Sequence, residues 1–187
     1  FPLWVRKALA NGVHLFTATG AVWGFLTLLA IWEQNFKLAI VYVIIAMFVD
    51  GFDGILARWL DVKTYAQGID GGLMDNIIDY LNYVVVASLL MIKVPGLLPQ
   101  GFEMACAISI LLTSGFQFSQ TDAKTDDQSY FFKGFPSVWN FLVIYMMLLG
   151  LNPWINLALV VICNILIFVP IKYLYPTRNT RLRRFTL

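Results

Sequence analysis

Four aspartates occupy positions where carboxylates are costly. Asp50 ends a long apolar run, Asp79 opens another, and Asp53 and Asp75 lie close by in the sequence. An ionisable side chain at membrane depth costs roughly 2.5–3.5 kcal/mol on insertion scales, so it usually marks a functional site. Four such groups would also repel one another. A bound cation relieves that repulsion, and oxygen ligands of this kind suit Mg²⁺, Mn²⁺ or Ca²⁺.

Helical spacing would bring these carboxylates onto two faces. On a helix, residues three, four, seven or eight positions apart share one face. Two such sets are Asp50, Asp53, Gly54 and Ala57, and then Gly71, Asp75 and Asp79. The polar link between them is short, so we expect antiparallel neighbouring helices with both carboxylate pairs turned to one cavity. The small residues leave room for a ligand or for close helix contact. Arg58 adds a cation at the rim that suits phosphate oxygens.

Acidic metal ligands beside an arginine suggest phosphate-ester chemistry. Two divalent ions could clamp a diphosphate and stabilise charge on the leaving oxygen, while one carboxylate takes the proton of an attacking hydroxyl. One alternative is a structural polar cluster, which would carry uncompensated charge. Another is a divalent-cation transporter that uses the carboxylates as a conduction site, although an arginine beside a cation pathway is unfavourable. For Arg58 itself, the alternative role is a topology anchor.

The composition is that of an integral membrane protein. Apolar residues make up 59% of the chain and charged residues 13%, whereas a soluble domain carries about 25% charged residues. The net charge is only +2, and no long basic tract of the kind that nucleic acid requires is present, so we expect no nucleic-acid partner. Cys106 and Cys163 lie in apolar runs and are expected to be buried small hydrophobes rather than a disulfide or metal pair.

The pattern predicts a single all-helical domain over residues 1–187, a polytopic membrane bundle. Six apolar stretches approach the ~20 residues of a spanning helix: Val13–Trp32, Leu38–Leu60, Leu73–Ile92, Phe102–Phe118, Val138–Leu151 and Trp154–Leu174. Residues 2–7 mix aromatic, apolar and basic side chains, which favours a short interfacial helix at the N-terminus. Because the chain begins at Phe1 and stops soon after a basic cluster, we expect both ends to be incomplete.

The distribution of Lys and Arg predicts the orientation. With the N-terminus in the cytoplasm, eleven of the thirteen Lys and Arg residues fall in cytoplasmic segments, and only Lys37 and Lys93 fall on the opposite side. Positive residues concentrate on the cytoplasmic side of membrane proteins. The aspartates would then lie near the cytoplasmic ends of the second and third spanning helices.

Two motifs carry a resemblance to a known family. They are Asp50-Gly-Phe-Asp53-Gly54-Ile-Leu-Ala57-Arg58 and Gly71-Gly-Leu-Met-Asp75-Asn-Ile-Ile-Asp79. Together they resemble the signature of the CDP-alcohol phosphotransferases, and all eight fixed positions of that signature are present. The resemblance covers the first three spanning helices directly and the whole chain in hydropathy.

One departure from the commonest family pattern points to a branch. Twelve residues separate Arg58 from Gly71, where most of the family has fewer, and this spacing is similar to the bacterial phosphatidylcholine synthase branch. Segments 14–20 and 122–140 are similar to that branch too. The resemblance implies transfer of the phosphatidyl group of CDP-diacylglycerol to choline, giving phosphatidylcholine and CMP. Serine, inositol or glycerol phosphate is the alternative acceptor. The branch usually has eight spanning helices against the six predicted here.

The resemblance also implies roles for individual residues. Asp50, Asp53, Asp75 and Asp79 would hold two divalent cations, Mn²⁺ or Mg²⁺, and Asp79 would also act as the general base on the choline hydroxyl. The CDP-diphosphate site would comprise His14, Thr17, Gly54, Ala57, Arg58 and Gly71. A buried interhelical histidine is the alternative for His14. The enzyme would lie in the bacterial inner membrane with its site facing the cytoplasm, and a homodimer is common in the family.

Choline sets a separate requirement, because its quaternary ammonium group has no N–H to donate. Aromatic faces hold such cations, each contributing ~0.5–2 kcal/mol. The candidates for an aromatic cage are Tyr80, Tyr83, Tyr130, Phe135 and Trp139, with an interfacial aromatic belt as the alternative for each. Lys124 and Lys133 are candidates for binding lipid phosphate, with positive-inside anchoring as the alternative.

Overall fold

The protein is a bundle of apolar helices, seen here in a computed structural model that describes residues 2–120, 131–133, 135–169 and 172–174. The α-helices are α1 (Leu3–Trp32), α2 (Phe36–Trp59), α3 (Val62–Tyr65), α4 (Gly71–Asp79), α5 (Val86–Lys93), α6 (Glu103–Phe118), α7 (Trp139–Leu149) and α8 (Pro153–Phe168). A π-helical segment, η1 (Tyr80–Val85), joins α4 to α5. Two short strands, β1 (Phe131–Lys133) and β2 (Lys172–Leu174), pair antiparallel.

The predicted polytopic membrane bundle is confirmed. Three helical rods, α1, α2 and Gly71–Lys93, are long and apolar enough to cross a membrane, and α6, α7 and α8 are shorter apolar helices. Many large apolar side chains point outward, for example Leu15 at 72% and Leu112 at 69% exposure. Exposure of so many apolar side chains is unfavourable in water and is expected of a surface that faces lipid. Each of the six predicted stretches is matched by one of these helices.

Two predicted boundaries are corrected. The N-terminal residues do not form a separate interfacial helix, because α1 runs unbroken from Leu3 to Trp32 and no proline interrupts it. The sixth stretch was predicted to continue to Leu174, but α8 ends at Phe168 and Val169 is extended, with φ −83° and ψ 120°. Val169 precedes a proline, and the residue before proline is disfavoured in the helical region.

Side-chain caps define several helix starts. Asn35 accepts the Leu38 backbone N–H at 3.3 Å at the start of α2. Asp70 accepts the Leu73 N–H at 3.0 Å before α4. Asn152 accepts the Trp154 N–H at 2.9 Å before α8. Asn and Asp are preferred at this position because their oxygens satisfy amides that lack a partner in the first turn.

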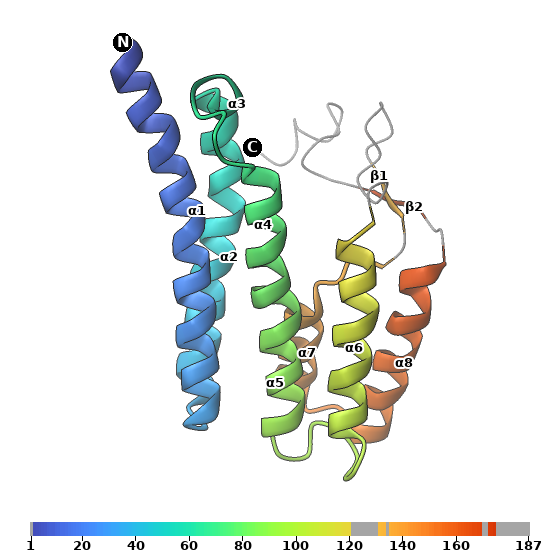
Figure 1. Cartoon of the computed structure of the whole chain (residues 1–187). Helices are drawn as coiled ribbons and strands as arrows, with labels where there is room; N and C mark the ends of the chain where they lie inside the picture. Colours follow the sequence, from blue (N-terminus) through green and yellow to red (C-terminus); the bar gives the residue numbers. More distant parts are fainter. Residues whose placement is uncertain (1, 121–130, 134, 170–171, 175–187) are drawn as a thin grey trace.

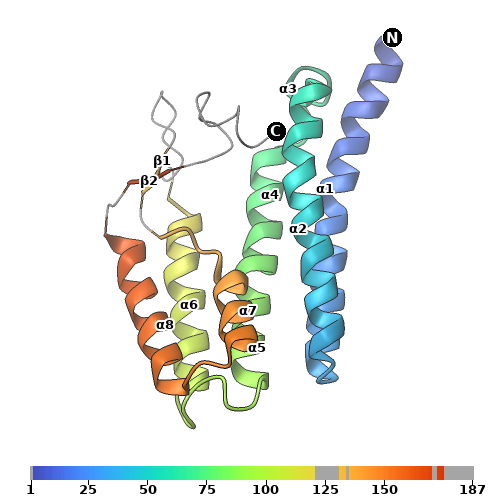
Figure 2. The same cartoon turned by 180° about the vertical axis from the view of Figure 1, so that it is seen from behind.

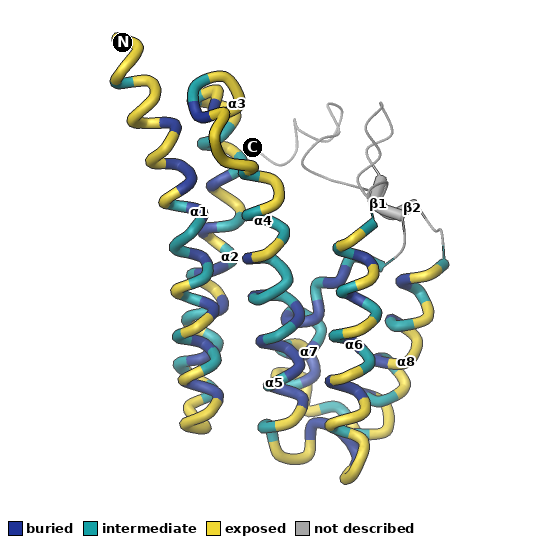
Figure 3. The backbone as a smooth tube through the Cα atoms, in the orientation of Figure 1, coloured by how far each residue is buried: buried dark blue, intermediate teal, exposed yellow. Residues whose placement is uncertain are grey.

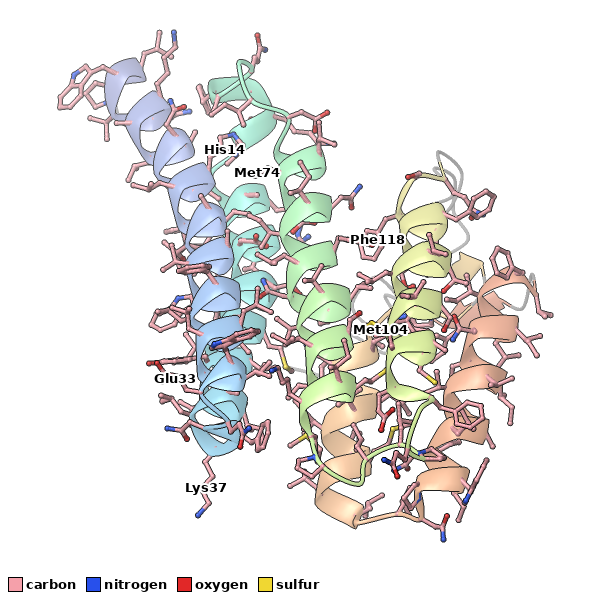
Figure 4. The ribbon with its side chains drawn as sticks, turned by 60° about the horizontal axis from the view of Figure 1, so that its bottom comes forward. His14, Glu33, Lys37, Met74, Met104 and Phe118 are labelled. Atoms are coloured by element: carbon pink, nitrogen blue, oxygen red, sulfur yellow. The ribbon has the colours of Figure 1, made fainter. Side chains whose placement is uncertain are left out.

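The rod formed by α4, η1 and α5 stands between two groups of helices (Figures 1 and 2). On one side it packs against α1, which pairs with α2, and on the other it packs against α6 and α7, while α8 packs against α6. Successive long helices run antiparallel. The starts of α1 and α4 and the end of α2 therefore share one end of the bundle, while Glu33 and Lys37 mark the other (Figure 4).

Buried apolar residues form two separate clusters. The main core takes Ala30 and Ile31 from α1 and continues through η1, α5, α6, α7 and α8, where the buried positions are densest in Figure 3. A small cluster of Ala10, Val13, Val62 and Ala66 joins α1 to α3 at the other end. Between the two, the buried face of α1 is polar or small, and the candidate site lies along that stretch.

Candidate active site

The inner face of α1 supplies one wall of the site. The residues buried along its middle are His14, Thr17, Gly20, Gly24 and Thr27, spaced three or four positions apart. That spacing keeps them on one stripe of the helix. A Cβ on Gly20 would lie 2.8 Å from Ile78 Cγ2, so only glycine lets α1 approach the third rod this closely. The Asn82 amide donates to the Gly20 carbonyl at 3.1 Å and holds this contact.

Three aspartates from two helices converge beside that wall. Carboxylate oxygens of Asp50 on α2 and of Asp75 and Asp79 on α4 lie within 4.8 Å of one another. We call these three residues the acid cluster. Each is half-buried. Unit charges this close repel strongly wherever water is scarce, so the arrangement suits a cation between them.

Asp53 borders the same space in a different environment. Its side chain is only 7% exposed, and it lies within hydrogen-bonding reach of Thr17 and of the Gly54 backbone N–H, with Arg58 nearby. Of the four predicted metal ligands, the structure therefore groups three closely and places the fourth on the α1 side of the site.

A small cavity of about 10 Å³ lies between these side chains, bordered by Thr17, Gly20, Ala46, Val49, Asp50, Asp53, Asp75, Ile78 and Asp79. This is close to the smallest space that holds one water molecule, and it is on the scale of an ion rather than of a nucleotide. Asp79 ends α4, eight residues beyond Gly71, and so lies roughly 12 Å along the rod from the helix start at 1.5 Å per residue. A larger hollow of about 740 Å³, bordered by Gly96, Glu103 and Trp154, lies at the opposite end of the bundle.

The rim of the site carries the predicted diphosphate residues. Arg58 is exposed in the last turn of α2. On Gly54, an added Cβ would meet only the Arg58 guanidinium within 4 Å, at 3.5 Å. Ala57 packs against the small cluster. The rim around Gly54 is thus open enough for a ligand to approach the backbone.

His14 and Gly71 are in direct contact across α1 and α4. A Cβ on Gly71 would lie 2.9 Å from the His14 ring carbon Cε1 and 3.3 Å from Nδ1. His14 is 6% exposed, and its Nε2 is buried with no hydrogen-bond partner among the described residues. Figure 4 shows His14 at the same end of the bundle as Met74 of α4. The predicted close approach at Gly71 therefore involves this histidine.

The aromatic candidates occupy three kinds of place. Tyr83 donates its hydroxyl to Asp50 Oδ2 at 2.6 Å and thus touches the acid cluster. Tyr80 instead donates to the Leu111 carbonyl at 2.9 Å. Trp139 is fully buried, donates its indole N–H to Ser114 Oγ at 2.8 Å and packs edge-on against Phe135. Of the candidates that the structure describes, Tyr83 is the one with a hydrogen bond to an aspartate.

Three predicted residues cannot be placed. Lys124 and Tyr130 lie outside the described residues, and the side chain of Lys133 is not described, although its backbone belongs to β1.

Three residues that line or support the site were not predicted. Gly20 and Asn82 join α1 to η1, and Phe141 of α7 stacks on Tyr83 with ring centroids 6.2 Å apart. The Gly20-x-x-x-Gly24 spacing was a usable signal, because small residues four apart allow helices to approach closely in membranes. No local signal marked Asn82 or Phe141, since their roles depend on which helices become neighbours.

The donor set fits a divalent cation. Hard cations such as Mg²⁺ and Mn²⁺ take carboxylate oxygens, and Asp50, Asp75 and Asp79 offer such oxygens from two helices within one small space. Asp53 is near enough to border the same cavity. The hydrogen bond from Tyr83 would orient the Asp50 carboxylate, as supporting contacts do in metal sites.

Comparison with known proteins agrees with this site. The family model for CDP-alcohol phosphatidyltransferases matches residues 7–169. A Legionella pneumophila phosphatidylcholine synthase is 42% identical over 166 residues, 89% of this chain and 64% of the relative. The chain thus spans less than two thirds of that protein. A Borreliella burgdorferi phosphatidylcholine synthase is 39% identical over 98% of this chain and 77% of the relative, and one from Pseudomonas aeruginosa is 37% identical over 93% and 72%. The chain, whose four aspartates border one cavity, therefore belongs to the CDP-alcohol phosphatidyltransferase family.

Proposed function

We propose that the protein transfers the phosphatidyl group of CDP-diacylglycerol to choline, forming phosphatidylcholine and CMP. The observation that carries the proposal is the acid cluster, set between two helices beneath an arginine-bearing rim. Family membership supplies the diphosphate chemistry, and several relatives that cover most of the chain are named phosphatidylcholine synthases.

The aspartates have distinct tasks in this reaction. Asp50, Asp53 and Asp75 hold two divalent cations, Mn²⁺ or Mg²⁺, and Asp79 completes the site. When bound, the cations neutralise the diphosphate and stabilise charge on the departing CMP oxygen. Asp79 accepts the proton of the choline hydroxyl as that oxygen forms a bond to the phosphorus bearing diacylglycerol. The bond between that phosphorus and the bridging oxygen breaks, and CMP leaves with the bonding electrons.

The rim residues hold the nucleotide side of the substrate. Arg58 can donate two parallel hydrogen bonds to phosphate oxygens. Gly54 leaves the α2 backbone uncovered beside it, so a diphosphate can approach the helix closely. Thr17 on α1 borders the small cavity, and His14 contacts Gly71 at the start of α4. The lipid tails would enter sideways from the bilayer, because the outer surfaces of these helices are apolar.

Choline is the acceptor favoured by the names of the relatives. A quaternary ammonium group is attracted to aromatic faces, and Tyr83, which stacks on Phe141, is an aromatic side chain that contacts the acid cluster. The alternative acceptors serine, inositol and glycerol phosphate keep the same chemistry. The site would face the cytoplasm of the bacterial inner membrane, because Arg6, Lys7, Arg58 and Lys63 lie on the helices and link at that end.

A transfer assay tests the function directly. Purified protein in lipid nanodiscs receives CDP-diacylglycerol, Mn²⁺ and radiolabelled choline, and we expect labelled lipid and CMP in equal amounts. Treatment with EDTA should stop the reaction, and added Mn²⁺ should restore it. Asp75→Asn should lose activity. Asp61→Asn is the matched control, because Asp61 is exposed and its φ of 47° suits asparagine.

Other results would redirect the proposal. Labelled lipid from serine, inositol or glycerol phosphate but not from choline would replace the acceptor and keep the chemistry. Transfer that persists after exhaustive chelation would remove the metal mechanism. Movement of Mn²⁺ into sealed vesicles without any lipid product would favour a transporter.

A further inference from the structure

We propose that Tyr83 is a positioning residue whose hydroxyl orients the Asp50 carboxylate toward the cation site. The inference rests on the proposed function, since it assigns Asp50 to a metal site. Its observational basis is separate: one short hydrogen bond, one unusual helical segment and one aromatic stack, all centred on the same side chain.

The hydrogen bond occupies one acceptor position of the Asp50 carboxylate. Tyr83 Oη donates to Oδ2 at 2.6 Å, within the range of hydrogen bonds from a hydroxyl to a charged acceptor. An ionised carboxylate has about four acceptor positions on its two oxygens. With one of them taken by Tyr83, rotation of the carboxylate is restricted, and an Asp50 oxygen lies within 4.8 Å of oxygens of Asp75 and Asp79.

The π-helical segment brings Tyr83 to this position. In an α-helix of 3.6 residues per turn, each four-residue step overshoots a full turn by about 40°, so Gly71, Asp75, Asp79 and Tyr83 would drift steadily around the rod. From Tyr80 the rod becomes π-helical, with more residues in each turn, so the step from Asp79 to Tyr83 no longer adds this overshoot. Such single π turns occur frequently at functional sites.

Neighbouring contacts hold the π turn and the tyrosine ring in place. Asn82 donates to the Gly20 carbonyl of α1 at 3.1 Å. On the other side of the rod, the Tyr83 ring stacks on Phe141 of α7, with centroids 6.2 Å apart and an interplanar angle of 15°. The π turn is therefore held to α1 through Asn82, while the Tyr83 phenol stacks on α7 and bonds to α2. A side chain that merely filled space would not need its hydroxyl aimed at a carboxylate.

Removal of the hydroxyl should weaken metal binding more than it disturbs the fold. Loss of a group that supports a metal ligand typically costs 10–100-fold in metal affinity or activity. We expect Tyr83→Phe to weaken Mn²⁺ binding 10–100-fold while the aromatic face toward Phe141 is retained. The Mn²⁺ concentration for half-maximal activity should rise by a similar factor, and saturating Mn²⁺ should restore much of the maximal rate.

The experiment measures Mn²⁺ binding without turnover. The full chain is stripped of metal, placed in nanodiscs and titrated with Mn²⁺, with the free ion followed by electron paramagnetic resonance. Tyr80→Phe is the matched control, because it is the same substitution in the same segment, but Tyr80 bonds to the Leu111 carbonyl. We expect the control to bind Mn²⁺ within twofold of the unmodified chain.

A double-substitution cycle separates positioning from general damage. If Tyr83 acts through Asp50, Tyr83→Phe should have no further effect on Mn²⁺ affinity in an Asp50→Asn background, because coupled residues are non-additive. An undiminished further loss in that background would overturn the proposal, even if Tyr83→Phe also lowered the amount of folded protein.

Three other outcomes would refute it as well. Unchanged Mn²⁺ affinity in Tyr83→Phe would exclude positioning, and a rise confined to the choline KM would assign Tyr83 to the acceptor instead. If the unmodified chain bound no Mn²⁺ at all, the metal mechanism itself would fail and this inference with it. The first two outcomes leave the proposed function intact, so the failures can be told apart.

Discussion

Gly71→Ala tests whether contact between α1 and α4 sets the geometry of the rim. Gly71 is the first residue of α4, and an added Cβ would lie 2.9 Å from His14 Cε1 and 3.3 Å from Nδ1. Ordinary contact begins at 3.4 Å, so the ring or the helix start must move by about 0.5 Å. His14 is buried and has little free space for this movement.

The expected magnitude combines two opposing terms. Overpacking a well-packed site costs about 1–3 kcal/mol, while replacing glycine by alanine in a helix gains up to about 1 kcal/mol. With the full gain from alanine, we therefore expect Gly71→Ala to lower the free energy of unfolding by up to about 2 kcal/mol. A misplacement of 1 Å can cost about 10²-fold in rate, so half that shift predicts about a tenfold loss in kcat/KM for CDP-diacylglycerol.

The assay compares neighbouring glycines in thermal unfolding and in transfer kinetics. Gly72→Ala is the control, because Gly72 is exposed and its added Cβ would meet only Asp70 Oδ1, at 3.5 Å. Combining Gly71→Ala with His14→Ala should recover stability, since the clashing ring is removed. If Gly71→Ala and Gly72→Ala behaved alike in both measurements, contact with His14 would not be what requires glycine here.

Two further substitutions test the reaction and the core. Asp79→Asn should lower turnover by about 10²–10⁴-fold, the usual contribution of a general base, while Mn²⁺ binding measured by magnetic resonance falls far less; normal turnover would contradict the base assignment. Trp139→Ala should cost about 3–5 kcal/mol of stability from lost packing, because the indole is fully buried and bonds to Ser114. Trp4→Ala is the control in thermal unfolding in detergent, because the Trp4 side chain is 73% exposed. The choline KM of the Trp139→Ala variant tests the predicted role of Trp139 in the aromatic cage.

The spanning helices could be predicted because a bilayer imposes long apolar runs with few breaks. The predicted start of the last stretch matched the observed helix at Asn152-Pro153, where a cap and a proline mark it, but its predicted end at Leu174 was wrong. The prediction was wrong at the N-terminus, where residues 2–7 have an interfacial composition but nothing that ends a helix. The composition of a segment indicates whether it prefers water, the interface or lipid. Whether a helix continues depends instead on whether a proline or a cap interrupts the backbone hydrogen bonds.

Helical spacing was enough to place Asp50, Asp75 and Asp79 together, since one short link forces α2 and α4 to be antiparallel neighbours. It did not predict that Asp53 would turn toward Thr17, because that depends on the rotation of α2 against α1. The supporting contacts of Tyr83 could not be predicted from the sequence either. They require a π turn and a partner on α7, 58 residues further along the chain, and neither leaves a periodic signal.

The main core has a consequence for the cell that is independent of the reaction. The lining of the small cavity includes the apolar residues Ala46, Val49 and Ile78. The main core consists of packed aliphatic and aromatic side chains, many of them with no exposure at all. Such a dry layer presents a high barrier to an ion. Cations would then reach the acid cluster from one compartment and return only to that same compartment. A chain that carries negative charges within its spanning helices would thereby leave the transmembrane voltage undissipated.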